Sequence, residues 1–308
     1  MKKEKVSPLK SKIRNNIPLA LMSLPALLYL FVFSYLPMFG VVIAFKDYNY
    51  TAGILGSPWA GFKHFKYFFT SNDAVVVLRN TILYNLLFLI LGTFLKVLVA
   101  LLLYEITSKK LLKTYQTSII LPNFISWVLV AYIGYALFSY ETGMLNGIRG
   151  IFGLSEINWY NTPKYWPFIL TIFEMWKGVG MGCIIYYASL MGLDPSLFEA
   201  AALDGANRFK QIIYISIPGI LPTICILLIM GVASIIGGDF GLFYQLPRNS
   251  GLLYPVTDVI STYVYRGLQM GNMSSTAAIG LFQNVVGLIL TLGTNWFVKK
   301  VNPENAMF

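Results

Sequence analysis

The sequence carries six apolar stretches, each long enough to cross a lipid bilayer as an α-helix. About 20 helical residues span the roughly 30 Å of hydrocarbon, and only helices and closed barrels satisfy their backbone hydrogen bonds there. The stretches lie near residues 18–44, 80–103, 117–139, 167–190, 214–237 and 276–298. The sequence therefore predicts an all-α integral membrane protein with six transmembrane helices.

The composition agrees with this prediction. The chain is 56% hydrophobic and only 12% charged, whereas soluble domains carry about 25% charged residues. The net charge of +10 could indicate a nucleic-acid partner, but the basic residues flank the apolar runs instead of lining one face. We therefore expect no nucleic-acid binding. Because His64 is the only histidine, histidine clusters for metal binding are excluded, and we expect no metal site.

The distribution of basic residues predicts the orientation. If the N-terminus is cytosolic, the cytosolic segments hold 13 Lys and Arg residues, against eight in the longer outer loops. The positive-inside rule then places both termini in the cytosol. We divide the chain into a basic cytosolic tail (1–16), a six-helix transmembrane domain (17–300) and a short cytosolic C-terminal tail (301–308).

Prolines interrupt three of the six stretches. Pro25 and Pro37 lie in the first, Pro122 in the third, and Pro218 and Pro222 in the fifth. Proline lacks the backbone N–H and clashes with the preceding turn of a helix. We expect these three helices to kink or to begin at the prolines.

The loop 194–213, placed in the cytosol by this orientation, carries the signals of a short capped helix. Asp194 can cap the N-terminus, Pro195 suits the first helical position, and Gly205 can adopt the left-handed conformation that ends a helix. The three alanines 200–202 leave the helix slim, so another surface can approach it closely. On these signals alone the loop could be a simple surface connector.

The order of residues in this loop is more specific than its caps. Glu199-Ala200-Ala201, followed by Asp204-Gly205, Ile217-Pro218 and Leu221-Pro222, resembles the EAA loop of binding-protein-dependent ABC importer permeases. The resemblance implies a type I ABC importer (MetI-like) permease fold, in which this loop is the cytosolic coupling helix that docks on the ATPase subunit. It places the docking contact on residues Glu199, Ala200, Ala201, Asp204 and Gly205.

Three further stretches, 37–49, 121–127 and 258–266, resemble the LplB-type, MalF/MalG-like permeases of carbohydrate ABC importers. Asn123 departs from that pattern, where many relatives have histidine. The resemblance implies a bacterial cell membrane protein that pairs with a second, homologous permease. It also implies two ATP-binding-cassette ATPase subunits, an extracellular solute-binding lipoprotein and an oligosaccharide or polysaccharide substrate. The particular sugar is not implied.

The chain has no Walker-type glycine-rich phosphate loop. We therefore expect no enzyme activity and no cofactor on this chain, with ATP and Mg²⁺ bound by the partner ATPase subunits. A membrane-bound transferase would need carboxylates or histidines clustered at one membrane face, and an ion-driven transporter commonly shows repeated halves; the sequence shows neither. An importer of a non-sugar solute such as a peptide stays open, because the EAA loop is shared across substrates.

Polar and aromatic side chains within the apolar stretches are candidates for the substrate path, since charges in a membrane are costly and usually functional. Glu174 and Lys177 are spaced to share one helix face, so they could instead neutralise each other. Amides and aromatic rings suit sugar hydroxyls and sugar faces, although packing is an alternative for each. The candidates are Trp127, Tyr132, Tyr135, Glu174, Lys177, Asp239, Gln283 and Asn284.

Overall fold

The computed structural model describes residues 16 and 21–301. In this part of the chain the regular structure is helical, and the one β-bridge, between Lys46 and Trp59, is isolated. The predicted all-α class is therefore confirmed. The tails 1–15 and 302–308 lie outside the described residues, as do residues 17–20.

Four of the expected stretches form continuous helices. They are Leu21–Phe45, which includes η1 (Phe31–Tyr35), α2 (Leu36–Met38) and η2 (Phe39–Phe45), then α5 (Asn72–Tyr104), α9 (Trp166–Met191) and α17 (Met273–Val301). Each is long and apolar enough to cross a membrane. The helices α5 and α17 extend past the apolar stretches because their first turns are polar, with Ser71 capping α5 through the N–H of Ala74.

The other two stretches are bent, as their prolines predict. The third combines α6 (Lys109–Ile120) and η3 (Leu121–Phe124) with α7 (Trp127–Phe138), which turns by 96°. The fifth runs through α11 (Arg208–Gln211), η6 (Ile212–Ser216) and α12 (Ile217–Gly219), then turns by 57° into α13 (Leu221–Ala233).

The bends have local causes. Pro122 lies in the first turn of η3, and Ser126 then caps the new helix α7 by accepting the N–H of Leu129. Pro222 stands in the first turn of α13, directly after the bend. The predicted effect is therefore present in these two stretches, although the chain turns after Pro122 and not at it. In the first stretch it is absent, because Pro25 and Pro37 lie within the continuous helix Leu21–Phe45.

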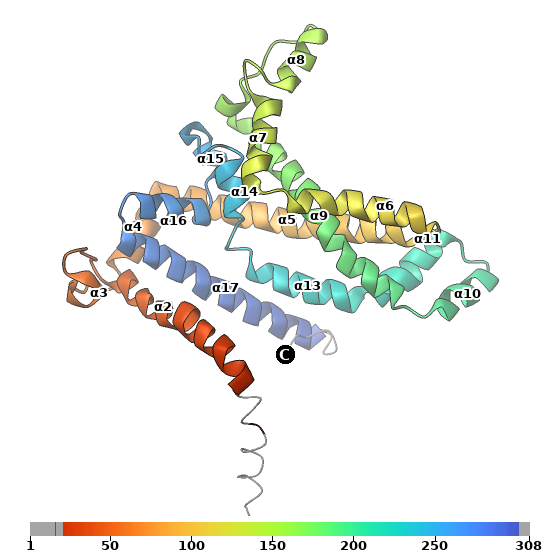
Figure 1. Cartoon of the computed structure of the whole chain (residues 1–308), viewed down its shortest axis with the longest axis horizontal. Helices are drawn as coiled ribbons and strands as arrows, with labels where there is room; N and C mark the ends of the chain where they lie inside the picture. Colours follow the sequence, from red (N-terminus) through yellow and green to blue (C-terminus); the bar gives the residue numbers. More distant parts are fainter. Residues whose placement is uncertain (1–15, 17–20, 302–308) are drawn as a thin grey trace, which may run out of the picture.

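Short helices connect the long ones: α3 (Gly53–Gly56), α4 (Lys63–Thr70), α8 (Met144–Ile151), η4 (Trp159–Asn161), η5 (Pro163–Tyr165), α10 (Pro195–Leu203), α14 (Phe240–Gln245), η7 (Gly251–Leu253), α15 (Tyr254–Thr257) and α16 (Ile260–Gln269). Figure 1 shows α10 and α11 at one end of the long helices, and α4 and α16 at the opposite end. The two sets of loops that the charge distribution separates thus lie at opposite ends of the bundle.

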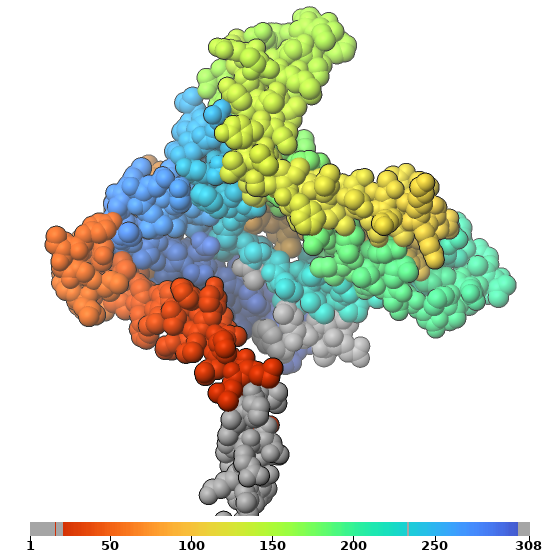
Figure 2. All heavy atoms as spheres, viewed as in Figure 1, coloured from red at the N-terminus to blue at the C-terminus, as the bar shows by residue number. Residues whose placement is uncertain are grey.

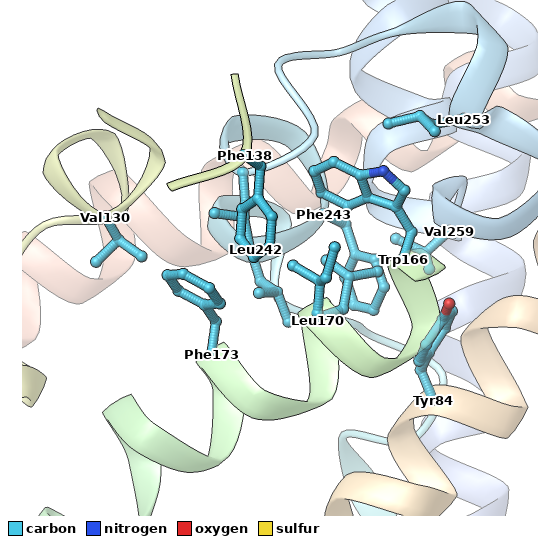
Figure 3. Close-up of a cluster of buried hydrophobic side chains, with 12 residues drawn as sticks. Tyr84, Val130, Phe138, Trp166, Leu170, Phe173, Leu242, Phe243, Leu253 and Val259 are labelled. Atoms are coloured by element: carbon cyan, nitrogen blue, oxygen red, sulfur yellow. The ribbon is translucent and has the colours of Figure 1, made fainter. Parts of the chain in front are cut away.

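The helices α5 and α9 form the centre of the bundle, where a cluster of buried apolar side chains joins them to α7 and α14. Figure 3 shows Trp166, Leu170 and Phe173 of α9 beside Tyr84 of α5 and Phe243 of α14. Such packing holds helices together in lipid, where burial from water contributes little. This cluster fixes α7 and α14 relative to α9, and these are the elements that carry the polar residues described below.

The first helix stands apart from the bundle. Its 18-residue apolar window has no buried residue, and its contacts with the rest of the chain run mainly from η2 to α17. Figure 2 shows this helix, coloured red, leaning away from the other spans. Its apolar side chains are therefore available to lipid or to another subunit.

Candidate functional site

The helix α10 has both ends fixed by the residues that the sequence singles out. Asp194 accepts the backbone N–H of Ser196 at 2.9 Å, and this hydrogen bond holds the pKa of Asp194 below its ordinary value. Gly205 has a φ of +79°. The N–H of Gly205 donates to Ala202 O at 3.1 Å and that of Ala206 to Ala201 O at 2.9 Å, which is a Schellman ending.

The outer surface of α10 is open. Glu199, Ala200 and Asp204 are exposed, and Leu203 is 90% exposed. On its other side the loop is tied to the end of α5: the ring of Phe198 lies 5.9 Å from that of Tyr104. A slim helix with fixed ends, one anchored edge and an open face suits docking in the groove of another protein.

A second group of candidates meets where the two bent stretches approach each other. Trp127 begins α7, directly after the 96° bend, and Asp239 caps α14, a few residues after the end of α13. The indole Nε1 of Trp127 donates to Asp239 Oδ2 at 2.8 Å. The other oxygen, Oδ1, accepts the N–H groups of Gly241 at 2.7 Å and Leu242 at 3.3 Å.

Gly241 is required for this contact. A Cβ at this position would lie 2.0 Å from Cδ1 of Trp127, closer than any atom pair tolerates, so the indole ring rests directly on the backbone of α14. One carboxylate therefore both caps a helix and holds a ring from another helix, 112 residues earlier in the chain.

Lys177 and Glu174 of α9 complete this polar cluster, but they do not pair with each other. Lys177 Nζ donates to the backbone oxygen of Asn123 at 2.7 Å and lies 5.4 Å from the centre of the Trp127 ring. The self-neutralised pair that the i, i+3 spacing suggests is thus replaced by a bond from α9 to η3. The Glu174 carboxylate lies within electrostatic range of Asp239, Lys96 and Lys177.

The remaining candidates lie elsewhere. Gln283 of α17 reaches toward the turn after α13, where its Nε2 would be 3.9 Å from a Cβ on Gly237. Asn284 donates to Gly280 O of its own helix at 3.0 Å and is exposed. Tyr132 and Tyr135 are exposed on α7 and line a separate hollow of about 270 Å³ between α7 and α14. The structure therefore brings together four of the eight candidates: Trp127, Glu174, Lys177 and Asp239.

Several participants were not among the candidates for the substrate path. Lys96 of α5 lies against Gly182 of α9 and within range of Glu174, although its position inside an apolar stretch is a signal for such a role. Asn123 acts through its backbone oxygen, which no side-chain pattern reveals. Gly241 matters because it lacks a side chain, and its partner Trp127 is remote in the sequence.

The stretch 258–266, which carried part of the family resemblance, has a structural role. Asp258 and Arg266 form a buried ion pair, and Thr262 donates to Asp258 Oδ1 at 2.6 Å. Asn80 of α5 donates to Asp258 O at 3.0 Å, and Tyr84 to Val256 O at 2.7 Å. These bonds fasten the segment between α14 and α16 to the N-terminal part of α5.

The loop after the first helix is fastened by a second charged group. Asp47 accepts two hydrogen bonds from Lys63 Nζ, at 2.9 and 3.0 Å, and its Oδ1 lies 2.9 Å from His64 Nε2. The bond from Lys63 holds the pKa of Asp47 below its ordinary value. The other ring nitrogen of His64, Nδ1, lies 3.3 Å from Ser275 Oγ of α17.

Known proteins resemble this chain over most of its length. Residues 78–303 match the family described as "Binding-protein-dependent transport system inner membrane component". Protein LplB of Bacillus subtilis (strain 168) is 37% identical over 93% of this chain and 90% of its own length. The polygalacturonan/rhamnogalacturonan transport system permease protein YteP of the same organism is 36% identical over 98% of this chain and 94% of its own.

A solved structure shares the fold as well. In the crystal structure of a bacterial alginate ABC transporter in complex with an alginate pentasaccharide-bound periplasmic protein, one chain superposes on this one with a TM-score of 0.86. The two are 33% identical, and the match covers 94% of this chain and 97% of that chain. The expected LplB-type resemblance and the expected fold are both confirmed.

Proposed function

The chain belongs to the family of binding-protein-dependent transport system inner membrane components, and we propose that it imports an oligosaccharide or polysaccharide as one permease of an ATP-driven complex. The observation that carries the proposal is the helix α10, exposed at one end of a bundle of membrane-spanning helices that also carries a polar cluster with an exposed Asp239 carboxylate. A permease of this kind needs both parts, one to receive force from the ATPase and one to move solute.

In this proposal α10 is the coupling helix. Glu199, Ala200, Ala201, Asp204 and Gly205 contact a groove of the ATPase subunit, and closure of the ATPase moves α10. The motion reaches the spans because Phe198 packs on Tyr104 and Arg208 lies 3.8 Å from Glu105, both at the end of α5. The fixed ends of α10 let it move as a rigid body.

The polar cluster is the proposed point of alternating access. The first bend lies directly before Trp127, and the second lies at the start of α13, the helix that leads to Asp239. A change of angle at either bend therefore moves Trp127 relative to Asp239. Trp127, Glu174, Lys177, Asp239 and Gln283 would then face the solute in turn. The chain itself performs no covalent chemistry; ATP and Mg²⁺ are bound by the partner ATPase subunits.

The remaining partners follow from the same proposal. A second, homologous permease covers the other side of the path, two ATPase subunits dock on the coupling helices, and an extracellular solute-binding lipoprotein delivers the sugar. Both termini are cytosolic, as the basic residues at the end that carries α10 support. A sugar is favoured over a peptide because YteP and the alginate transporter are named for polysaccharides.

The test is reconstitution of the complete complex in proteoliposomes with its binding protein. We expect saccharide uptake that requires ATP and the binding protein together, and no ATP hydrolysis by this chain alone. Robust hydrolysis by the isolated chain, or uptake driven by an ion gradient without the ATPase, would overturn the proposal. Competition by peptides, with no competition by saccharides, would overturn the substrate class while leaving the permease role intact.

A further inference from the structure

The segment between α14 and η7 places an unpaired cation among tyrosines. Arg248 is exposed, and its guanidinium carbon lies 4.3 Å from the centre of the Tyr135 ring on α7. Within the described part of the chain, its side chain forms no ion pair and donates no hydrogen bond. All five N–H groups of the fork are therefore free for a ligand.

The backbone fixes the position of this cation. Arg248 and Asn249 have φ values of 56° and 49°, and they are the two non-glycine residues with positive φ among the described residues. Such strained positions persist only where the surroundings impose them, and they cluster at functional sites. Here the N–H of Asn249 donates to Tyr244 O at 3.0 Å, and Tyr254 donates to Asn249 Oδ1 at 3.0 Å.

Arg248 and Tyr135 stand between two hollows. One, of about 270 Å³, also has Tyr132, Tyr244 and Gln245 in its wall, and the other, of about 460 Å³, has Tyr140, Glu141 and Tyr160. Glu141 is exposed, and it is the one carboxylate among the residues that line either hollow. Together the hollows offer aromatic faces on both sides of one cation.

Tyr160 gives a second, independent sign of a ligand. Its hydroxyl is buried and has no hydrogen-bond partner, although buried polar groups are nearly always satisfied. Burial raises the pKa of Tyr160 to about 12, so the hydroxyl keeps its proton and can donate it. An orphaned donor and a free guanidinium next to the same Tyr135 ring call for an acceptor that the protein does not supply.

We propose that Arg248, Tyr135 and Tyr160 form a subsite for a carboxylate-bearing sugar unit, a uronate, at the outer end of the path. The guanidinium fork binds the carboxylate through two parallel hydrogen bonds, and the tyrosine rings stack on the sugar face. Aromatic stacking alone accepts any sugar, whereas the fork selects an acidic one. The inference rests on the proposed function and narrows its substrate class.

The test compares two probes of equal length in proteoliposomes holding the complete importer and saturating binding protein. One probe is an oligouronate and the other its neutral methyl ester. Because the substitutions lie in the permease, a changed ratio of the two uptake rates reports on this chain and not on the binding protein. Asparagine tolerates the left-handed backbone, so Arg248→Asn removes the cation while keeping the turn.

We expect Arg248→Asn to lower uptake of the oligouronate by about tenfold to a hundredfold relative to the methyl ester, the loss typical of a charged hydrogen-bonded partner. The uptake ratio of Arg248→Lys should lie between those of the wild type and Arg248→Asn, since an ammonium keeps the charge without the fork. Tyr135→Leu should lower uptake of both probes, because stacking is blind to charge. The control is Arg149→Asn, which removes a half-buried arginine of α8 that donates to Ser155 O and does not line the hollows.

Equal losses for both probes in Arg248→Asn would overturn the inference and assign Arg248 to structure or to docking of the binding protein. Unchanged uptake of both would overturn it as well. A wild-type complex that imports neither probe nor any other saccharide would overturn the proposed function with it. Saccharide uptake by the wild-type complex thus distinguishes a failure of the proposed subsite from a failure of the proposed function.

Discussion

The helix α10 and the polar cluster around Trp127 are built in opposite ways. Every bond that shapes α10 joins residues at most five positions apart, from the cap at Asp194 to the Schellman ending at Gly205. The cluster joins η3, α7, α9 and α14, with partners 54 and 112 residues apart. A local element can be changed without disturbing the bundle, whereas a change in the cluster should be felt in several helices at once.

Charge reversal at the docking face should give the largest functional loss. If α10 docks as proposed, Glu199→Lys sets a like charge against a basic partner on the ATPase, and an unpaired, desolvated partner at an interface costs about 2–5 kcal/mol. We expect normal insertion and assembly with the partner permease, but loss of ATPase co-purification and of stimulated hydrolysis. The matched control is Glu156→Lys, a charge reversal at an exposed outer position. Normal coupling in Glu199→Lys would reduce α10 to a connector.

The cluster should behave as one unit. Trp127→Phe removes the indole donor to a carboxylate, a bond worth about 1.5–3 kcal/mol, and Asp239→Asn removes the charge while keeping a side chain that can cap α14. We expect the two losses in thermal stability to be non-additive in a double-mutant cycle, as is usual for residues in contact. When either change is combined with Glu199→Lys, the two losses in thermal stability should add. A non-additive loss in such a double variant would show that α10 and the cluster are not independent.

The end of α10 offers a graded test. Gly205→Val forces a β-branched residue into the left-handed region, at a cost of roughly 1–2 kcal/mol, whereas Gly205→Asn is tolerated there. A Cβ at Gly205 has open space around it, so the effect comes from the backbone alone. We expect stimulated ATP hydrolysis to fall in the valine variant and to stay near wild type in the asparagine variant. Equal activity of the two would show that the ending of α10 need not be rigid.

The smallest effect is expected in the loop after the first helix, where the contribution of Asp47 to thermal stability depends on pH. Because the folded pKa of Asp47 is below its ordinary value of 3.8, the bond to Lys63 contributes fully above about pH 4 and is lost as the pH falls through the folded pKa. Thermal unfolding should show Asp47→Asn slightly less stable than wild type from pH 5 to 8. The two should converge below pH 4. A difference that grows as the pH falls below 5 would have the wrong sign.

The contrast between the two regions also explains what the sequence could predict. The caps of α10 and the length of the spans are local, so Asp194, Pro195 and Gly205 were placed correctly from residue types alone. The bond from Lys177 to the backbone of Asn123 depends on how η3 lies against α9, and helical spacing instead suggested Glu174 as its partner. Arg248 drew no notice because its importance arises from a strained turn and from a tyrosine on another helix.

The isolated first helix has a consequence for how the protein is made. Between Leu21 and Phe39 the side chains are exposed, with Tyr29 64% exposed, and only the end of the helix packs on α17. Such a helix is stable in lipid before anything packs on it, because its backbone bonds are internal. The rest of the bundle does not depend on where this helix packs, so it can insert and fold before the proposed second permease is present. In that assembly the first helix is the part of this subunit whose packing the partner would complete.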